Sequence, residues 1–176
     1  TEVILSAGSS PMMPPIPGIE KAGFVSEFLT DRKEAGKQIV IIGGGLAGCE
    51  AACYLKENAE TVTIIEMQED ILFGCDHCLN NDQALRQMLQ DNNINKITKA
   101  TVTKIEDNRV TYLQDNQEYT IVCDTIINAA GFKPNDQLED ALEEIYDDVT
   151  VIGDAKAPRK ILTAIHEGYH AIRVME

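Results

Sequence analysis

The 176-residue chain has no tryptophan, few basic residues and no long apolar run, and each shortage narrows what the protein can be. Lys and Arg number 15 against 29 Asp and Glu, which gives a net charge of −14. A field of that sign repels phosphate backbones and anionic lipid, so we expect neither nucleic acid nor a membrane surface as partner. No apolar stretch approaches the ~20 residues that span a bilayer, and no signal-peptide pattern opens the sequence.

The five cysteines are odd in number and scattered, so they do not form the disulfide framework of a secreted domain. We therefore expect a reducing cytoplasm. Cys75 and Cys78 form a C-x-x-C pair, which is typical of a redox dithiol or of half a zinc site. No second C-x-x-C completes four ligands, which favours ordinary loop cysteines. Cys49 and Cys53, at i and i+4, are predicted to be small core residues.

The string HEGYH, residues 166–170, satisfies the H-E-x-x-H signature of zinc metalloproteases. His166 and His170 would share one helix face, with Glu167 as general base. Such sites need a third protein ligand, commonly well downstream, but only six residues follow His170. Gly168 also weakens a helix where rigid ligand geometry is needed. We therefore expect a terminal helix without metal, and keep a zinc-binding hydrolase as a remote alternative.

The most informative stretch is a β-α-β pattern of about thirty residues. A β-branched, apolar run at 39–42 predicts a buried parallel strand, helix formers follow over 46–58, and a second β-branched run covers 61–66. Between the first strand and the helix lies G-x-G-x-x-G. In that motif Gly43 permits the tight turn, Gly45 lets the backbone approach a pyrophosphate, and Gly48 lets helix and strand pack closely. The helix amino terminus then favours the phosphates.

Glu66 ends the second strand about twenty residues after the motif, where the residue that binds the adenosine ribose is expected. Its carboxylate accepts hydrogen bonds from ribose hydroxyls and repels a 2′-phosphate. Residues 67–69 offer no arginine for that phosphate. The pattern therefore favours NADH over NADPH.

Further elements complete an α/β, Rossmann-like, three-layer domain with a parallel sheet and a β-meander. Residues 9–23 hold four of the six prolines and are predicted to be an extended connector between two structural units. Thr1 in place of Met, followed at once by a strand pattern, indicates a piece of a longer chain. The other expected elements are a helix at 81–90, strands at 101–105, 109–113, 118–122 and 125–127 in a meander, a helix at 137–145, a strand at 149–152 and a helix at 160–174.

The strings "VIIGGGLAGCEAA" and "VTIIEM" resemble the nicotinamide-binding domain of flavoproteins with two dinucleotide-binding domains, the disulfide-reductase-like group. "LSAGSSPMMPPIPG" is similar to the crossover that leaves the flavin domain, and "INAAGFKPN" to the strand and loop that close the nicotinamide domain. "TVIGDAKAPRKILTAIHEGYHA" resembles the terminal flavin-contacting segment. Over nearly its whole length, the chain most resembles the C-terminal part of NADH:flavin oxidoreductases of the 2-enoate reductase and 2,4-dienoyl-CoA reductase type.

This resemblance implies three segments and a multidomain parent enzyme. Residues 1–36 would be the end of the flavin domain and the Pro-rich crossover, 37–134 the NAD(H)-binding domain, and 135–176 the return segment of the flavin domain. The chain would position NADH for hydride transfer to FAD, and the parent would reduce an activated C=C bond. In such enzymes FMN and a 4Fe-4S cluster belong to an N-terminal barrel. A single glycine motif is present, so we expect FAD in the intact parent, with the remainder of the same polypeptide as partner.

The resemblance also assigns roles to particular residues. Glu66 would bind the adenosine ribose beside Met67, and Asp154 would bond the ribityl-phosphate region of the flavin. The residues implied for the pyrophosphate are Gly43, Gly45, Leu46, Ala47 and Gly48, and those implied beneath the nicotinamide are Ala130 and Gly131. No side chain is assigned a catalytic role, because hydride passes directly between the two rings. A non-catalytic NAD(H)-sensing regulatory domain remains the alternative from a different class.

Overall fold

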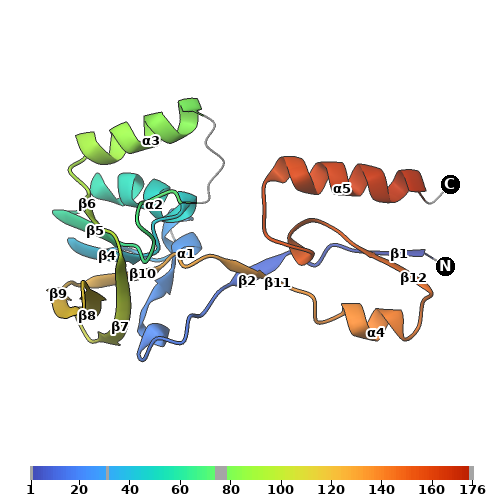
Figure 1. Cartoon of the computed structure of the whole chain (residues 1–176), viewed down its shortest axis with the longest axis horizontal. Helices are drawn as coiled ribbons and strands as arrows, with labels where there is room; N and C mark the ends of the chain where they lie inside the picture. Colours follow the sequence, from blue (N-terminus) through green and yellow to red (C-terminus); the bar gives the residue numbers. More distant parts are fainter. Residues whose placement is uncertain (1, 31, 74–78, 175–176) are drawn as a thin grey trace. The chain divides into compact units, whose positions relative to one another are not determined.

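The computed structural model describes residues 2–30, 32–73 and 79–174, which fall into two compact units (Figure 1). Unit 2 comprises residues 13–131, and unit 1 comprises residues 1–12 together with 132–176.

A five-stranded parallel sheet forms the middle of unit 2. Its strand order is β3 (Gly23–Phe24), β10 (Thr125–Asn128), β4 (Gln38–Ile42), β5 (Thr61–Ile65) and β6 (Asn95–Ile97), and every neighbouring pair is parallel. The strands β4, β5 and β10 are almost continuously apolar and β-branched, as a sheet covered on both faces requires.

Helices cover one face of this sheet and a β-meander covers the other (Figure 1). The helices are α1 (Val25–Leu29), α2 (Leu46–Lys56) and α3 (Leu79–Asp91), and the meander strands are β7 (Ala100–Glu106), β8 (Arg109–Gln114) and β9 (Gln117–Val122). Alternate residues of β4 serve the two cores: Ile41 packs with the helices, whereas Val40 packs with the meander. The predicted three-layer Rossmann-like architecture is confirmed.

Strand β10 is where the expected topology differs. The sequence pattern grouped residues 125–127 with the meander, but β10 lies inside the parallel sheet, between β3 and β4. A short apolar run carries no information about its partners, so its place is set by tertiary pairing. Asp124 reinforces that pairing, because its Oδ2 accepts hydrogen bonds from the amides of Lys37 at 2.8 Å and Gln38 at 3.0 Å.

The described residues of unit 1 form two short sheets and two helices. β1 (Glu2–Leu5) pairs in parallel with β12 (Asp148–Val151), and β2 (Ser9–Pro11) pairs antiparallel with β11 (Phe132–Pro134). The remaining elements are α4 (Glu139–Glu143), a 3-10 turn η2 (Gly153–Ala155) and α5 (Ile161–Val174). α4 is shorter than the helix expected at 137–145.

The Pro-rich connector is less uniform than expected. Its first residues form the paired strand β2, and Ile19–Lys21 form a 3-10 turn, η1. Proline is tolerated in β2 because the strand lies in a two-stranded sheet and only one side must pair.

The units also divide at other residues than the expected boundaries at 36/37 and 134/135. Residues 13–36 belong to unit 2, because Val25 and Phe28 are buried in the same core as Ile41. β11 belongs to unit 1 because it pairs with β2. Within the described ranges, no helix is both long enough and apolar enough to cross a membrane.

Candidate nucleotide-binding site

A cavity of about 500 Å³ opens in unit 2 where the parallel strands end. The last residues of β4 and β5 and the segment after β10 contribute to its wall. Ligands of open parallel sheets bind at this carboxyl edge, outside the strand ends. The lining residues come from five segments: 14–16, 42–45, 65–68 with Phe73, 100–102 and 129–131.

Two glycines of the motif are required by the fold itself. Gly43 has φ +111°, and a Cβ there would lie 2.5 Å from the carbonyl oxygen of Ala129. A Cβ on Gly48 would lie 2.1 Å from the carbonyl oxygen of Gly43. Both contacts are with backbone, which cannot swing aside. These glycines therefore let α2 and the segment after β10 approach the turn closely.

Gly45 is different, because nothing in the described part of the protein requires a glycine there. Its φ of −71° and ψ of −174° are open to any residue, and a Cβ at this position would have no heavy atom within 4 Å. Gly45 lines the cavity and is the N-cap residue of α2, where helix amides lack intrahelical partners. A bound phosphate group fits this position, because the space that a Cβ would partly fill is open and lies at a helix amino terminus.

Glu66 lies in the cavity wall with its side chain largely buried. Its Oε2 accepts a hydrogen bond from the Gly44 amide at 2.6 Å, and its Oε1 accepts one from the Gln68 amide at 2.7 Å. The carboxylate therefore joins the end of β5 to the glycine loop. Each oxygen has a second lone pair, so the group retains acceptor capacity for a hydroxyl.

The turn after β10 also contributes to the cavity wall. Ala130 and Gly131 both line it, and Gly131 has φ +102° with open space where a Cβ would be. The buried Asn128 supports the turn, since its Oδ1 accepts a hydrogen bond from the Ala130 amide at 3.1 Å. The structure thus brings the sequence-predicted Gly43, Gly45, Glu66, Met67, Ala130 and Gly131 to one cavity.

Three of the expected residues lie just outside that lining. Leu46 and Ala47 begin α2, where Leu46 is exposed and Ala47 packs partly against the core, and Gly48 is buried behind them. The sequence in turn missed the apolar part of the wall, which includes Ile16, Phe73 and Val102. These residues come from distant segments and carry no motif, so only the fold reveals them.

Asp154 belongs to unit 1, whereas the residues that line the cavity belong to unit 2. Its Oδ2 accepts a hydrogen bond from the Ser9 hydroxyl at 3.1 Å, and its Oδ1 accepts one from the Arg159 amide at 3.3 Å. The carboxylate thereby joins the start of β2 to the turn that precedes α5.

The histidines of HEGYH lie on α5, and both are exposed. Glu167 accepts hydrogen bonds from the Gly153 amide at 2.8 Å and from the Arg159 guanidinium. The Gly153 amide, together with Arg159, holds the pKa of Glu167 below its ordinary value, so the carboxylate acts as a structural acceptor. Among the described residues, no three His, Cys, Asp or Glu are grouped as a metal site.

The described cysteines behave as core residues. Cys49 and Cys53 are buried in the helix-side core and are not in disulfides, as predicted. Burial raises the pKa of the Cys123 thiol to about 11, so it stays protonated. Cys75 and Cys78 lie outside the described residues.

Comparison with known proteins identifies the family. The family model described as pyridine nucleotide-disulphide oxidoreductase matches residues 1–168. The chain belongs to this family. Its members are oxidoreductases, and membership implies binding of a pyridine nucleotide and of FAD.

Several relatives of the chain are named enzymes. Cinnamate reductase of Clostridium sporogenes is 33% identical over 173 residues, covering 98% of this chain and 26% of that protein. Dihydrolipoyl dehydrogenase of Acholeplasma laidlawii is 40% identical over 138 residues, covering 76% of this chain and 40% of that protein. The chain therefore spans between a quarter and two fifths of these relatives.

Solved structures show the same fold. A 2-naphthoyl-CoA reductase in complex with 2-naphthoyl-CoA superposes with a TM-score of 0.84 at 28% identity, covering 96% of this chain and 26% of that one. Thioredoxin reductase of T. acidophilum superposes with a TM-score of 0.77 at 22% identity, covering 97% of this chain and 63% of that one. At the lower identity the likeness concerns the fold alone.

Proposed function

We propose that unit 2 binds NADH, with the pyrophosphate against the glycine loop 43–45 and the adenosine ribose beside Glu66. The observation that carries the proposal is Gly45, whose missing side chain is explained by no contact among the described residues. Gly131 lines the same cavity and has open space where a side chain would be, which supports a close approach of the nicotinamide half of the ligand to this turn. Leu46, Ala47 and Gly48 would contribute through the first turn of α2.

The preference for NADH follows from charge at the adenosine end. Glu66 places a carboxylate in the wall, and its neighbours Met67 and Gln68 carry no positive charge. A 2′-phosphate in the same place would meet a fixed negative charge without a compensating cation from these neighbours. NADPH is therefore disfavoured relative to NADH.

The role of bound NADH would be to deliver hydride to FAD in a multidomain flavin oxidoreductase that reduces an activated C=C bond. Similarity to cinnamate reductase and to 2-naphthoyl-CoA reductase supports this reaction class. FAD would supply a two-electron acceptor, and Asp154, tied to Ser9 and Arg159, would contact it from this chain. FMN and a 4Fe-4S cluster would belong to a further segment of the parent, and no residue here is assigned to them.

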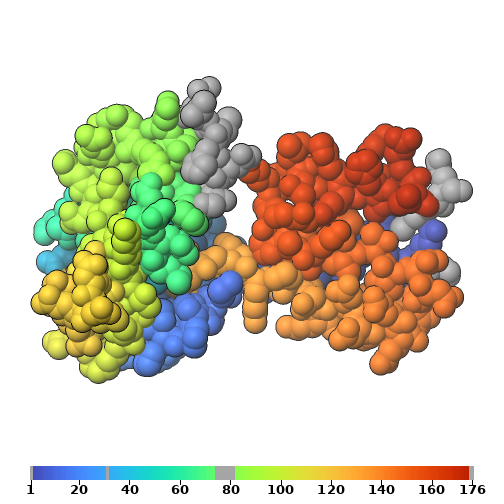
Figure 2. All heavy atoms as spheres, in the orientation of Figure 1, coloured from blue at the N-terminus to red at the C-terminus, as the bar shows by residue number. Residues whose placement is uncertain are grey.

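The partner we propose is the remainder of the same polypeptide, in the cytoplasm. An apolar stripe on α5 supports it, because these side chains are large and exposed: Ile161, Leu162, Ile165, Tyr169 and Ile172. Figure 2 shows red atoms of α5 at the surface of unit 1, uncovered by other segments of that unit on the side facing the viewer. In an intact flavin domain this stripe would be buried.

The proposal is tested by titrating the full chain with NADH and with NADPH, following ligand fluorescence, for the natural protein and for Glu66→Gln. We expect at least tenfold tighter binding of NADH by the natural protein, a difference of about 1.4 kcal/mol. Because Glu66 also supports the glycine loop, Glu66→Gln should weaken the binding of both ligands. The informative quantity is therefore the ratio of the Kd for NADPH to the Kd for NADH. That ratio should fall toward one. Equal binding of the two cofactors by the natural protein contradicts the specificity, and no binding of either contradicts the function.

A further inference from the structure

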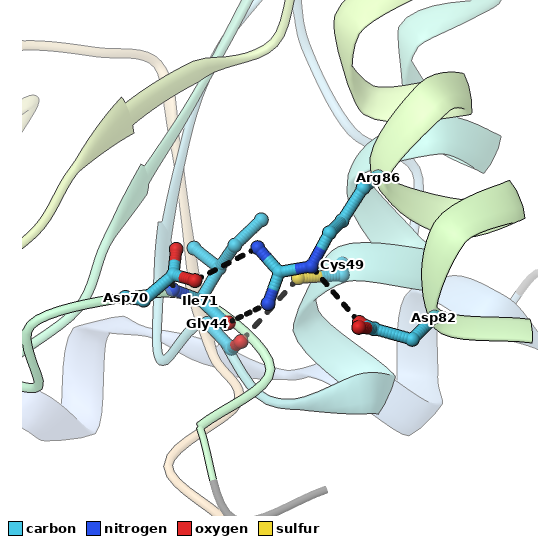
Figure 3. A network of polar contacts seen from close by, with 6 residues as sticks. All are labelled: Gly44, Cys49, Asp70, Ile71, Asp82 and Arg86. Atoms are coloured by element: carbon cyan, nitrogen blue, oxygen red, sulfur yellow. Dashed lines mark hydrogen bonds and ion pairs between the residues drawn. The ribbon is translucent and has the colours of Figure 1, made fainter. Parts of the chain in front are cut away.

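A three-way contact of one arginine joins α3 to the segment that follows β5. Arg86 Nη1 lies 2.9 Å from Asp70 Oδ2, its Nη2 donates to the carbonyl oxygen of Ile71 at 2.9 Å, and its Nε donates to Asp82 Oδ1 at 3.0 Å (Figure 3). Asp82 lies one turn earlier on the same helix, whereas Asp70 and Ile71 belong to the segment 66–73. The planar guanidinium therefore ties that segment to the helix at two adjacent points.

The same segment is bonded to the middle residue of the glycine loop. The Leu72 amide donates to the Gly44 carbonyl oxygen at 2.7 Å, and the Gly44 amide donates to Glu66 Oε2 at 2.6 Å. The fit is close, since a Cβ on Gly44 would lie 3.0 Å from Ile71 Cγ2. Both polar groups of Gly44 are thus held by segment 66–73.

Segment 66–73 contains one residue in a rare backbone conformation. Leu72 has φ +59°, a conformation that a leucine adopts rarely, although its side chain is buried with that of Ile71. Arg86 is bonded to the two residues directly before Leu72. The four residues Glu66, Met67, Gln68 and Phe73, on either side of the supported part, line the cavity, whereas Arg86 does not.

We propose that Arg86 is a positioning residue for the adenosine half of the nucleotide. This inference rests on the proposed function. By fixing residues 70–72, Arg86 holds Gly44 and Glu66 in the arrangement that receives the pyrophosphate and the ribose. Lysine cannot replace it fully, because a single ammonium lacks the planar fork that reaches a carboxylate and a carbonyl together. Loss of Arg86 acts on the ligand only through the loop.

The test compares Arg86→Ala and Arg86→Lys with the natural full chain, using NADH and ADP-ribose as ligands. ADP-ribose carries the adenosine half and both phosphates but lacks nicotinamide. We expect Arg86→Ala to raise the Kd for both ligands by the same factor, about three- to tenfold, with Arg86→Lys in between. Arg109→Ala, which removes an exposed arginine of β8, is the matched control and should change neither Kd.

Titrations are done where circular dichroism shows each variant folded, so that a loss of affinity is not a loss of folded protein. If Arg86→Ala does not fold, Asp70→Asn is used instead, because it weakens the ion pair with Arg86 at an exposed carboxylate. We expect it to raise both Kd values by a smaller factor. Unchanged Kd values in a folded Arg86→Ala, or a rise for NADH without a rise for ADP-ribose, would overturn the proposal.

Amide hydrogen exchange at Gly44 and Leu72 separates this proposal from the proposed function. Faster exchange at both amides in Arg86→Ala shows that Arg86 holds the loop, even where the natural chain binds no NADH, in which case the proposed function alone fails. Exchange at the natural rate overturns the positioning role.

Discussion

Gly45 and Gly48 are glycines for two different physical reasons. Gly48 is needed because α2 packs onto the turn at Gly43, whereas Gly45 faces open space at the cavity. Replacement by alanine therefore separates the demands of the fold from those of the ligand.

Gly45→Ala is expected to leave the fold intact and to weaken NADH binding. The new methyl group meets no described protein atom, so the free energy of unfolding should change by no more than about 1 kcal/mol, the usual scale of an N-cap substitution. The Kd for NADH should rise at least about tenfold, because the methyl group occupies space that the pyrophosphate needs. Urea unfolding and fluorescence titration measure the two effects.

Gly48→Ala is the contrasting variant. Its Cβ would overlap the Gly43 carbonyl oxygen, so the free energy of unfolding should fall by about 1–3 kcal/mol or more. A Gly45→Ala protein that binds NADH as tightly as the natural chain would refute the assignment of the pyrophosphate.

Motif residues were predictable, and their supports were not. Gly43, Gly45 and Glu66 lie within one β-α-β unit, so spacing along the chain locates them in space. Asn128 supports its turn through the amide of Ala130, two residues along the chain, whereas Arg86 contacts Asp70 and Ile71, which only folding brings beside it. Neither stands in a pattern with a chemical meaning of its own, so sequence reasoning passed over both.

At the scale of elements, the pairing of β10 with β4 depends on contacts at the strand starts. Asp124 accepts hydrogen bonds from the amides of Lys37 and Gln38, and the Thr125 hydroxyl accepts one from the Gly36 amide at 2.8 Å. Burial raises the pKa of Asp124, but the hydrogen bonds from the two amides and from the Thr125 hydroxyl together lower it by a larger amount. The pKa of Asp124 therefore lies below its ordinary value of 3.8.

Asp124→Asn should therefore destabilise the protein in a pH-dependent way. A carboxylate whose folded pKa is depressed stabilises the fold above its unfolded pKa, and that contribution is lost as the pH falls through the folded pKa. We expect a loss of about 1 kcal/mol at pH 7, since the group is solvent-exposed, and a smaller loss below pH 4. Urea unfolding at both pH values measures it, with Asp115→Asn as the exposed control. A loss equal at both pH values would show that the charge is not involved.

The exposed stripe of α5 carries a second prediction at this scale. We expect the chain to self-associate through this stripe as its concentration rises. Replacing Ile165 and Ile172 by lysine should abolish that association, because two of the large exposed apolar side chains become charged. Sedimentation velocity over a range of concentrations measures association, and NADH affinity should stay unchanged. A natural chain that sediments as a monomer at all concentrations contradicts the view that the stripe needs a cover.

Strong local patterns were predicted well, and weak ones were not. β4, α2 and β5 appear where the apolar period and the glycine turn placed them. The five-residue helix α1 and the three-residue strand β6 are too short to show a period and were missed. The pairing of β2 with β11 joins residues more than 120 apart, which no local pattern reveals.

Across the whole molecule, the buried core lies overwhelmingly in unit 2. Both core clusters are made of residues 19–127, while the buried apolar residues of unit 1 are Leu5, Ala155 and Ala171 among those described. The unit that holds the cavity thus has its own core on both faces of its sheet. Nucleotide binding should therefore be a property of unit 2, independent of unit 1.

Amide hydrogen exchange of the full chain with and without saturating NADH tests this central claim most directly. Binding should slow exchange in the segments that line the cavity, around residues 42–48, 65–68 and 129–131, because the ligand covers and stabilises them. Exchange in α5 should not change. Protection absent from all three segments, or confined to unit 1, would contradict the assignment of unit 2 as the NADH-binding unit.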